Sequence, residues 1–248
     1  MIIQNKTLKM TKGGSLLTTG WNRFKGFLLY LVSYAYDIMV TYPLTRAVYF
    51  HFADEFNRKF PGKKVSMVDV GTGTGTPLKG IMNKVSFSRV LAVDIDKAYL
   101  TVAKKNLAEF PEVEVKYQDF MTLDTDAQGE KFDIIFFGFS FMLMPDRIKA
   151  LRIARSLLKP GGKIYMFLTL YEKKSKFIEW VKPKMKYLFS IEFGPVVYTN
   201  ELHKNFAEAG FEVVSKEKLG AKLSWLLKFF KIYAYEVRST EAALLDAR

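Results

Sequence analysis

The sequence predicts an α/β protein built on a mostly parallel sheet, and three observations lead to this fold class. From residue 64 onward, short runs rich in β-branched and aromatic residues alternate with longer stretches of helical periodicity. The length of 248 residues and the 49% of hydrophobic residues suit one domain with a buried core and exclude a disordered chain. A glycine-rich turn, in the stretch VDVGTGTGTPL, follows the first of these runs, where a strand is expected to give way to a helix.

Seven strands are expected, five of them in a first group and two in a second. The first five lie at about 64–70, 88–94, 112–117, 132–138 and 162–169, with helices near 76–86, 96–109 and 145–158. The last two, near 211–217 and 230–237, are separated by a stretch too short for another helical crossover, so an antiparallel pair at one sheet edge is expected. The predicted architecture is therefore a Rossmann-like, doubly wound, seven-stranded sheet, mostly parallel with an antiparallel edge strand.

Residues 1–62 precede the sheet and are predicted to form an N-terminal helical cap. The stretch PLTRAVYFHFADEFNRKF has apolar residues at i, i+3 and i+4 spacing and is followed by Pro61 and Gly62, which break a helix. The main domain is expected at 63–238, with a lid rich in lysine and aromatic residues inserted at 171–196, and a C-terminal tail at 239–248.

Charge and composition limit the partners. There are 38 Lys and Arg against 25 Asp and Glu, and the net charge of +13 favours an anionic partner such as nucleic acid, anionic lipid or an acidic substrate. The sequence has no cysteine, which excludes disulfides and thiolate sites, and its two histidines, His51 and His203, lie far apart. No metal site is therefore predicted.

Two features of the N-terminal region bear on localisation. The first 36 residues contain no acid and several basic and hydroxyl residues, a composition shared by mitochondrial transit peptides. A mitochondrial location is therefore an alternative to the cytoplasmic one expected. The apolar stretch 27–36 is too short to span a bilayer, so no transmembrane helix is predicted, and an interfacial helix stays open.

The glycine-rich turn has the properties of a ligand site. Gly71, Gly73 and Gly75 follow the first strand, and the next helix is expected to begin with Thr76 as its N-cap and Pro77 at its first position. Glycine lets the backbone turn sharply and lets a ligand lie against it, while the helix N-terminus offers free N–H groups. The spacing fits neither the G-x-G-x-x-G dinucleotide fingerprint nor a P-loop.

The pattern D-x-G-x-G-x-G, from Asp69 to Gly75, resembles motif I of the class I S-adenosylmethionine-dependent methyltransferases. Further landmarks of that family follow in order: LAVDID with Asp94, VKYQDF with Asp119, the fourth-strand segment KFDIIFF, and the turn LLKPGGKIYMF. The resemblance covers residues 64–170 strongly and 198–237 through topology alone. It implies a class I methyltransferase domain over 63–238 and S-adenosylmethionine as its cofactor.

The same resemblance implies the cofactor-binding residues. Asp94 would accept hydrogen bonds from both ribose hydroxyls, which suits a carboxylate facing a vicinal diol. Asp119 would receive the adenine amino group, with Phe120 packing beside the base, whereas Asp96 is expected to cap the following helix. The whole predicted set is Asp69, Gly71, Thr72, Gly73, Gly75, Asp94, Ile95, Asp119, Phe120 and Phe139.

The segment after the fourth strand limits the acceptor. Methyl transfer from a sulfonium needs alignment and exclusion of water more than a particular catalytic side chain. This chain has GFSF where amino-methyltransferases of adenine or glutamine carry an Asn/Asp-Pro-Pro-aromatic motif, so that subclass is not expected. Met142, Leu143 and Met144 replace the histidine pair of many small-molecule members, and both an apolar pocket wall and core packing fit them.

The predicted acceptor is a small lipophilic molecule: a quinone precursor, a phospholipid or a sterol-like compound. The segment SYAYDIMVTYPLTRAVYF is similar to part of the quinone-ring C-methyltransferases and to the cap helix of phospholipid N-methyltransferases. Basic and aromatic residues in the lid fit a peripheral contact with an anionic membrane, although a solvated amphipathic helix fits them equally. Tyr36 and His51 are the candidates to take a proton from the acceptor. An RNA methyltransferase and a non-catalytic cofactor-binding subunit are the alternatives.

Overall fold

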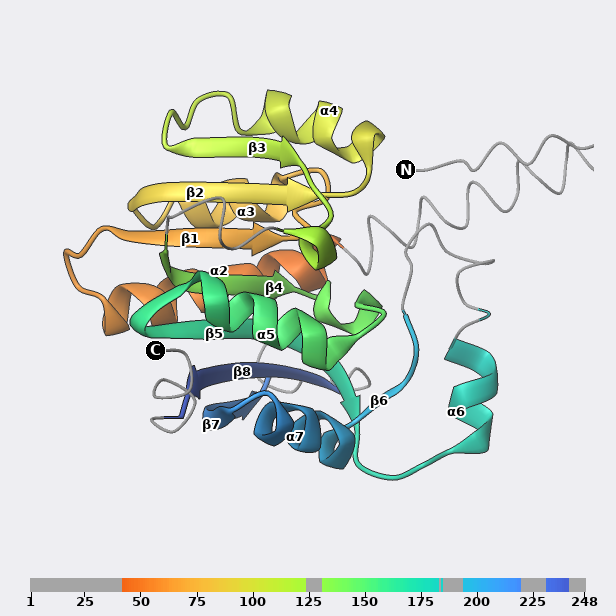
Figure 1. Ribbon diagram of the computed structural model, residues 1–248. Coiled ribbons are helices and arrows are strands. Elements are labelled where there is room, and N and C mark those ends of the chain that lie inside the picture. The colour runs from red at the N-terminus through yellow and green to blue at the C-terminus, as the bar shows by residue number, and fades with distance from the viewer. Residues whose placement is uncertain (1–41, 124–130, 183, 185–193, 220–230, 241–248) are drawn as a thin grey trace, which may run out of the picture.

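The computed structural model of the protein describes residues 42–123, 131–182, 184, 194–219 and 231–240 (Figure 1). A single twisted sheet occupies its centre, in the strand order β3-β2-β1-β4-β5-β8-β7. The strands are β1 (Val65–Val70), β2 (Phe87–Asp94), β3 (Val113–Tyr117), β4 (Phe132–Gly138), β5 (Leu158–Tyr171), β6 (Val197–Tyr198), β7 (Phe211–Lys218) and β8 (Ile232–Ser239). The helices are α2 (Tyr42–Lys59), α3 (Thr76–Met82), α4 (Lys97–Asn106), α5 (Arg147–Leu157), α6 (Lys176–Val181) and α7 (Thr199–Glu208), with short 3₁₀ turns η2 (Phe120–Thr122) and η3 (Phe141–Leu143).

The strand order confirms the doubly wound sheet. From β1 the chain moves outward through β2 to β3, and it then returns to place β4 on the other side of β1, with all of these pairings parallel. The order of the strands therefore reverses between β1 and β4, and their carboxyl ends form a crevice there in folds of this kind. This is the place where the glycine-rich turn emerges.

The structure also confirms the predicted antiparallel pair at one edge of the sheet and shows which strand is reversed. β8 runs antiparallel to both β5 and β7, so the reversed strand lies second from the edge, and the edge strand β7 has the direction of β5. The two-residue strand β6 and helix α7 were not anticipated. β6 pairs with the far end of β5, which extends well beyond the strand expected at 162–169.

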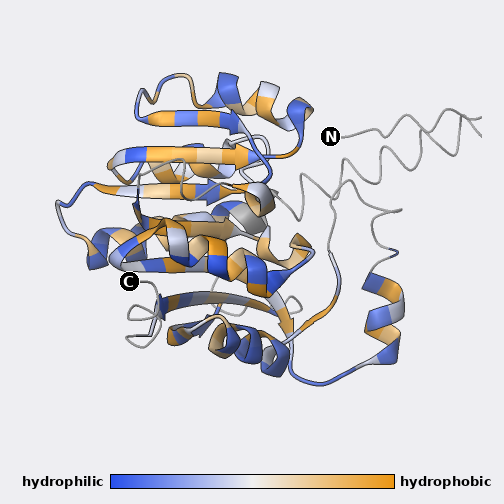
Figure 2. Ribbon diagram, in the orientation of Figure 1, coloured by the Kyte–Doolittle hydropathy of each residue, from blue (hydrophilic) through white to orange (hydrophobic). Residues whose placement is uncertain are grey.

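Helices cover both faces of the sheet, and each face has its own hydrophobic core. One core joins α2, α3 and α4 to the sheet, and the other joins α5 and α7 to it. Because both faces are covered, all six residues of β1 are buried, as expected for a central parallel strand. In Figure 2 the central strands are accordingly mostly orange, the colour of hydrophobic residues.

Helix α2 is the described part of the predicted N-terminal cap, and it lies flat against the sheet. Val48, Phe52 and Phe56 repeat at i+4 spacing, and all three are buried in the core that α2 shares with α3 and α4. The Phe52 ring stacks on Phe136 of β4 with 4.7 Å between centroids. Burying a side chain of this size contributes about 2–3 kcal/mol, which explains why α2 is fixed to the sheet. The domain boundaries proposed from the sequence stay predictions.

The predicted lid begins with α6, which stands apart from the other helices in Figure 1. Ser175 caps it by accepting a hydrogen bond from the Ile178 N–H, and Phe177 and Trp180 are 72% and 63% exposed. Across the described ranges, none of the helices is both long and apolar enough to cross a membrane.

Candidate functional site

The three glycines of the turn after β1 all have left-handed backbones, with φ of 74° at Gly71, 58° at Gly73 and 69° at Gly75. A side chain on Gly71 or Gly75 would also clash, because its Cβ would lie 2.6 Å from Ser140 Cβ or 2.8 Å from Leu107 Cδ1. A Cβ on Gly73 would have no neighbour within 4 Å. The space over Gly73 is therefore where a ligand can lie against the backbone.

Asp94, the last residue of β2, is held in place by this turn. Its Oδ2 accepts a hydrogen bond from the Gly73 N–H at 2.8 Å, and its Oδ1 accepts one from the Asp96 N–H at 2.9 Å. Each carboxylate oxygen keeps a second acceptor position, which suits the two hydroxyls of a ribose. Asp96 caps α4 through Ala98 and Tyr99, as the sequence predicted.

The candidates for the adenine site have different environments. Asp119 is exposed at the end of β3, where it accepts a hydrogen bond from the Met121 N–H at 2.8 Å. Ile95 is 67% exposed and offers an apolar surface next to Asp94. Phe120, in contrast, is buried in the core with its ring 5.4 Å from that of Phe137. The structure thus assigns Phe120 to core packing, and its contact with the base stays a prediction.

Asp69 is buried at the end of β1. Burial raises its pKa to about 7, and the charge of Asp94 adds to the shift. The Thr72 hydroxyl lowers this pKa, by more than the charge of Asp94 raises it, although burial outweighs both. The Tyr49 hydroxyl donates to the Gly138 carbonyl at 3.2 Å, and burial together with the charge of Asp69 raises the pKa of this tyrosine.

Tyr49 was not among the predicted site residues. Its place in the helical apolar pattern, one turn before Ala53, predicted only that it would be buried. Its hydrogen bond to Gly138, 89 residues further along the chain, depends on the way α2 crosses the sheet and leaves no signal in the local sequence.

Phe139 has an unusual backbone at the carboxyl end of β4. Among the described residues other than glycine it alone has a positive φ, at 67°. Its N–H donates to the Phe167 carbonyl at 3.2 Å, and the following Ser140 hydroxyl donates to the Val70 carbonyl of β1. Such conformations are strained and cluster at functional sites. The strain lies at the point where the strand order reverses.

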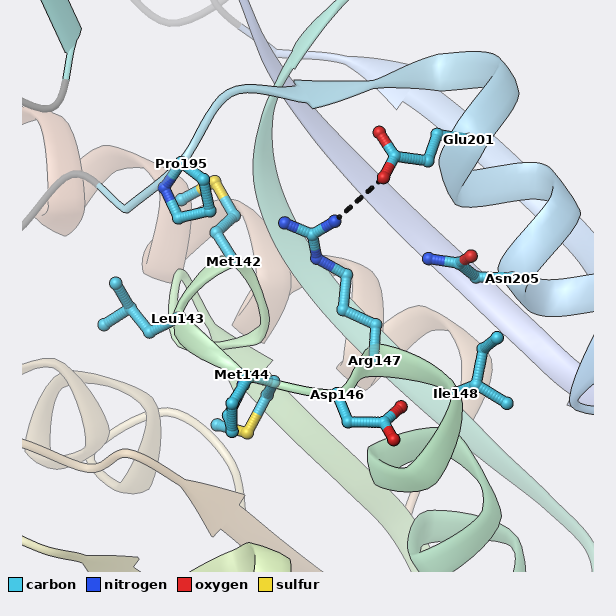
Figure 3. Close-up of a pocket in the computed structure, with 10 residues that line it drawn as sticks. Met142, Leu143, Met144, Asp146, Arg147, Ile148, Pro195, Glu201 and Asn205 are labelled. Atoms are coloured by element: carbon cyan, nitrogen blue, oxygen red, sulfur yellow. Dashed lines mark ion pairs between the residues drawn. The ribbon is translucent and has the colours of Figure 1, made fainter.

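A pocket of about 540 Å³ opens beyond this point, on the side of α5 and α7 (Figure 3). Its wall is about equally apolar and polar, and the residues that line it are Met142, Leu143, Met144, Pro145, Asp146, Arg147, Ile148, Pro195, Glu201 and Asn205. Of the three residues that could have been pocket or core, Leu143 is exposed and Met144 half-buried, while Met142 is buried and lines the pocket as well. The pocket interpretation therefore fits this segment.

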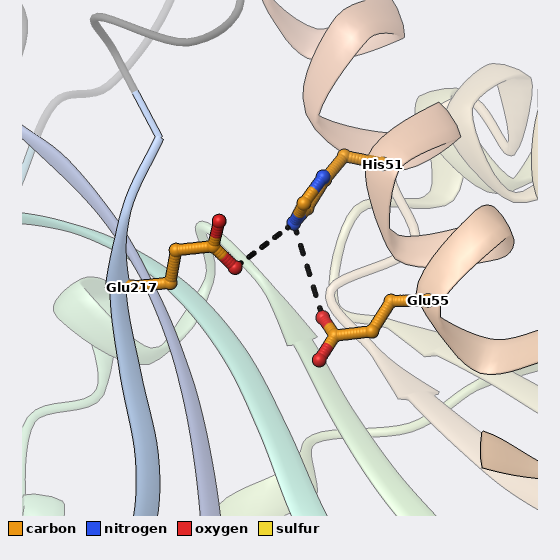
Figure 4. A group of neighbouring side chains, drawn as sticks. All are labelled: His51, Glu55 and Glu217. Atoms are coloured by element: carbon orange, nitrogen blue, oxygen red, sulfur yellow. Dashed lines mark hydrogen bonds and ion pairs between the residues drawn. The ribbon is translucent and has the colours of Figure 1, made fainter. Parts of the chain in front are cut away.

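His51, one of the two predicted proton acceptors, does not line this pocket. His51 Nε2 lies 3.2 Å from Glu217 Oε2 of β7 and 3.9 Å from Glu55 Oε2 (Figure 4). β7 is four strand positions from β1, which is about 19 Å at the usual spacing, so His51 is remote from the glycine turn. Tyr36 lies outside the described residues. A catalytic role for either residue stays a prediction.

The His51, Glu55 and Glu217 side chains could also hold a metal ion, since their ligand atoms lie within 4.8 Å of one another. However, Lys59 Nζ is already 2.7 Å from Glu55 Oε1 and also pairs with Glu236 of β8. We interpret the group as a network of charges that ties α2 to β7 and β8.

The fold and the site define a class of protein. A glycine turn that donates to an acid at the end of the second strand, at the reversal of strand order, is the arrangement of a nucleoside-binding α/β domain. Residues 68–164 match the family model described as a methyltransferase domain. The fold, the turn and this match together identify a methyltransferase domain of the class I, S-adenosylmethionine-dependent type over these residues.

Curated relatives and solved structures agree with this assignment. Malonyl-[acyl-carrier protein] O-methyltransferase 1 of Ilyobacter polytropus is 28% identical over 153 residues, 59% of this chain and 56% of that protein. Demethylmenaquinone methyltransferase of Staphylococcus aureus is 26% identical over 159 residues, 63% of this chain and 65% of that protein. The chain thus matches less than two thirds of the length of either relative.

Among solved structures, a SAM-dependent methyltransferase from Aquifex aeolicus superposes with a TM-score of 0.55 at 18% identity, covering 76% of this chain and 89% of that one. The glycopeptide N-methyltransferase MtfA, complexed with S-adenosylmethionine, gives a TM-score of 0.56 at 12% identity over 76% of this chain and 93% of that one. These likenesses confirm the predicted fold.

Proposed function

We propose that the protein transfers a methyl group from S-adenosylmethionine to a small lipophilic acceptor. The observation that carries this proposal is that a pocket with an apolar wall of methionine, leucine and proline begins two residues after a contact of the cofactor turn. Ser140, against which Gly71 packs, is followed two residues later by Met142, the first residue of the pocket wall. Relatives named for demethylmenaquinone and for ubiquinone biosynthesis support an acceptor of the quinone-precursor type.

The described residues fit the cofactor. Asp94 would hold the ribose, the open backbone of Gly73 would face the cofactor, and Ile95 with Asp119 would flank the adenine. Bound S-adenosylmethionine would supply a methyl group that its sulfonium charge already activates.

The pocket residues would align the acceptor and exclude water more than they would move a proton. Asp146 is occupied in capping α5 through the Lys149 N–H, and Glu201 pairs with Arg147. Neither acid is therefore placed as a free base. Alignment in a water-poor pocket is the main contribution expected of this chain.

Contact with an anionic membrane surface is the second element of the proposal. Phe177 and Trp180 project from α6, and Lys184 Nζ lies 3.4 Å from the centroid of the Trp180 ring. Exposed aromatic side chains beside lysines are the anchors used by proteins that lie at the interface. The location, cytoplasmic or mitochondrial, stays an expectation from the sequence. The net charge of +13 keeps RNA as the alternative acceptor.

The decisive experiment supplies purified protein and methyl-labelled S-adenosylmethionine with a total lipid extract and, separately, with total RNA. We expect label in the lipid fraction. Asp94→Ala should weaken cofactor binding in calorimetry by about 1–3 kcal/mol, or roughly 5- to 150-fold, because the diol loses its acceptor. Asp54→Ala, which removes an exposed acid on α2, is the control and should bind normally.

Label in RNA alone would replace the lipophilic acceptor by a nucleic acid. Cofactor binding without label in either extract would favour the non-catalytic subunit.

A further inference from the structure

Lys182, the residue that ends α6, is a buried cation beside the acceptor pocket. Its side chain is only 5% exposed, and its Nζ donates to the Pro195 carbonyl at 2.9 Å and to Thr169 Oγ1 at 3.3 Å. Pro195 lines the pocket, and Thr169 Oγ1 lies 3.1 Å from the sulfur of Met142, which lines it as well. Lys182 is therefore bonded directly to one residue of the pocket wall and through Thr169 to another.

A second cation, Arg147, lies close by at the start of α5. In Figure 3 its side chain extends between Pro195 and Glu201. Its Nη1 is 3.5 Å from Glu201 Oε1, and its Nε is buried without a hydrogen-bond partner among the described residues. Burial, and then the charge of Arg147, lower the pKa of Lys182 to about 8. The two cations thus lie near enough to repel each other.

The negative charge available to this pair is small. In the described part of the chain no carboxylate forms an ion pair with Lys182, and the one that pairs with Arg147 belongs to Glu201, which is 52% exposed. The other acid of the pocket, Asp146, is exposed and accepts from the Lys149 N–H. Buried charges in proteins are normally paired, so Lys182, which has no acid partner among the described residues, and Arg147, which has only an exposed one, lack a full counter-charge.

We infer that Lys182 and Arg147 form a subsite for an anionic oxygen group, a phosphate or a carboxylate, on an otherwise apolar acceptor. The planar guanidinium and the ammonium suit such oxygens, and the wall of methionine, leucine and proline suits a hydrocarbon portion. This inference rests on the proposed function, because it takes the pocket as the acceptor site. If Lys182 served only to tie β5 to the segment before β6, its hydrogen bonds would suffice and ligands would not sense its charge.

The test is calorimetric titration with four probes: octyl phosphate, octanoate, octanol and inorganic phosphate. We expect octyl phosphate or octanoate to bind at least about tenfold more tightly than octanol, and more tightly than inorganic phosphate. Arg147→Gln and Lys182→Met should each lose about tenfold in affinity for the anionic amphiphile and keep their affinity for octanol. Arg152→Gln on the exposed side of α5 and Lys173→Gln before α6 are matched controls and should bind like the wild type.

Equal binding of octanol and octyl phosphate, or full binding of octyl phosphate by Arg147→Gln, would overturn the subsite. If Lys182→Met does not fold, as judged by its melting transition, Arg147→Gln decides alone. S-adenosylmethionine affinity is measured on the same samples. If the protein binds the cofactor but shows no preference for anions, the subsite is wrong and the proposed function stands. If it prefers anions but does not bind the cofactor, the proposed function is wrong and only the anion site stands.

Discussion

The cofactor side and the acceptor side of this site are built in different ways. On the cofactor side, the turn after β1 and the end of β2 are fixed by backbone hydrogen bonds: the N–H groups of Gly71 and Thr72 donate to the Val93 carbonyl, and that of Gly73 donates to Asp94. On the acceptor side, the pocket is formed by side chains from segments well separated along the chain, at 142–148, 195 and 201–205. The cofactor side thus uses two strands that are neighbours in both the sequence and the sheet, whereas the pocket brings together elements that lie further apart along the chain.

The two sides also differ in the sign of their least exposed charges, although the exposed acids Asp146 and Glu201 line the pocket as well. Asp69 and Asp94 stand on the cofactor side, where a sulfonium is expected, whereas Arg147 and Lys182 stand on the acceptor side. The net charge of +13 predicts anionic partners for the whole chain, but it does not describe the charge on the cofactor side or on the acceptor side. Local charge is the better guide to ligands in a crevice.

The largest effect expected on the cofactor side is the pH dependence of stability due to Asp69. Burial raises its pKa from 3.8 to about 7, so the folded state binds a proton that the unfolded state has lost between these values. The contribution of this group to the free energy of unfolding is therefore fully present below about pH 4. It is lost as the pH rises through 7, and the total loss is roughly 4 kcal/mol. In urea unfolding, the free energy of unfolding of Asp69→Asn relative to that of the wild type should be higher at pH 8 than at pH 5.

Asp54→Asn, at an exposed aspartate, should follow the wild type at both pH values. Parallel profiles for Asp69→Asn and the wild type would mean that Asp69 ionises as freely as a surface residue. The contrast of charge would then rest on Asp94 alone.

The second effect separates packing from ligand contact within the glycine turn. Gly75→Ala should cost about 3 kcal/mol of unfolding free energy, because the new Cβ adds overpacking against Leu107 to the strain of a left-handed backbone. Gly73→Ala carries the same strain without the clash and should cost about 1 kcal/mol. Calorimetry should show Gly73→Ala losing cofactor affinity, since its methyl group enters the open space over the turn. Equal unfolding costs for the two variants would contradict this division.

The smallest effect concerns Tyr49, which lies between the two sides. Tyr49→Phe removes the hydroxyl that donates to Gly138 and should lower the unfolding free energy by about 1 kcal/mol. Both the cofactor and octyl phosphate should still bind within a few fold of the wild type, because neither depends on that hydroxyl. Tyr117→Phe, an exposed tyrosine of β3, is the control for stability. A loss of both affinities would show that the two sides are coupled through β4.

Most of the features that could be predicted from the sequence belong to the sheet and to the cofactor side. Strands, the doubly wound order and the cofactor turn are encoded in short segments, and Asp94 and Asp96 take the places that their positions before α4 predicted. The burial of Phe120, whose ring packs against Phe137 in the core, was not predicted from its place next to Asp119, and its contact with the base stays a prediction.

The acceptor side could be predicted only in outline. The apolar segment at 142–144 was recognised, but the partners that complete the pocket come from α7 and from the segment before β6. His51 shows that the chemistry of a residue does not predict its position in the fold. A histidine within the helical cap was a reasonable base, yet the crossing of α2 places it against Glu217 on the far edge of the sheet.

The short pairing of β6 with β5 fixes both ends of the connection between these two strands. Leu170 pairs with Val197 and Tyr171 with Tyr198, so the two ends of the connection between β5 and β6 lie side by side. The entropy of closing such a loop grows only with the logarithm of its length, and doubling the loop costs about 0.6 kcal/mol. Insertions and deletions between these fixed ends are thus thermodynamically inexpensive, and the same sheet can carry connections of different lengths at this place.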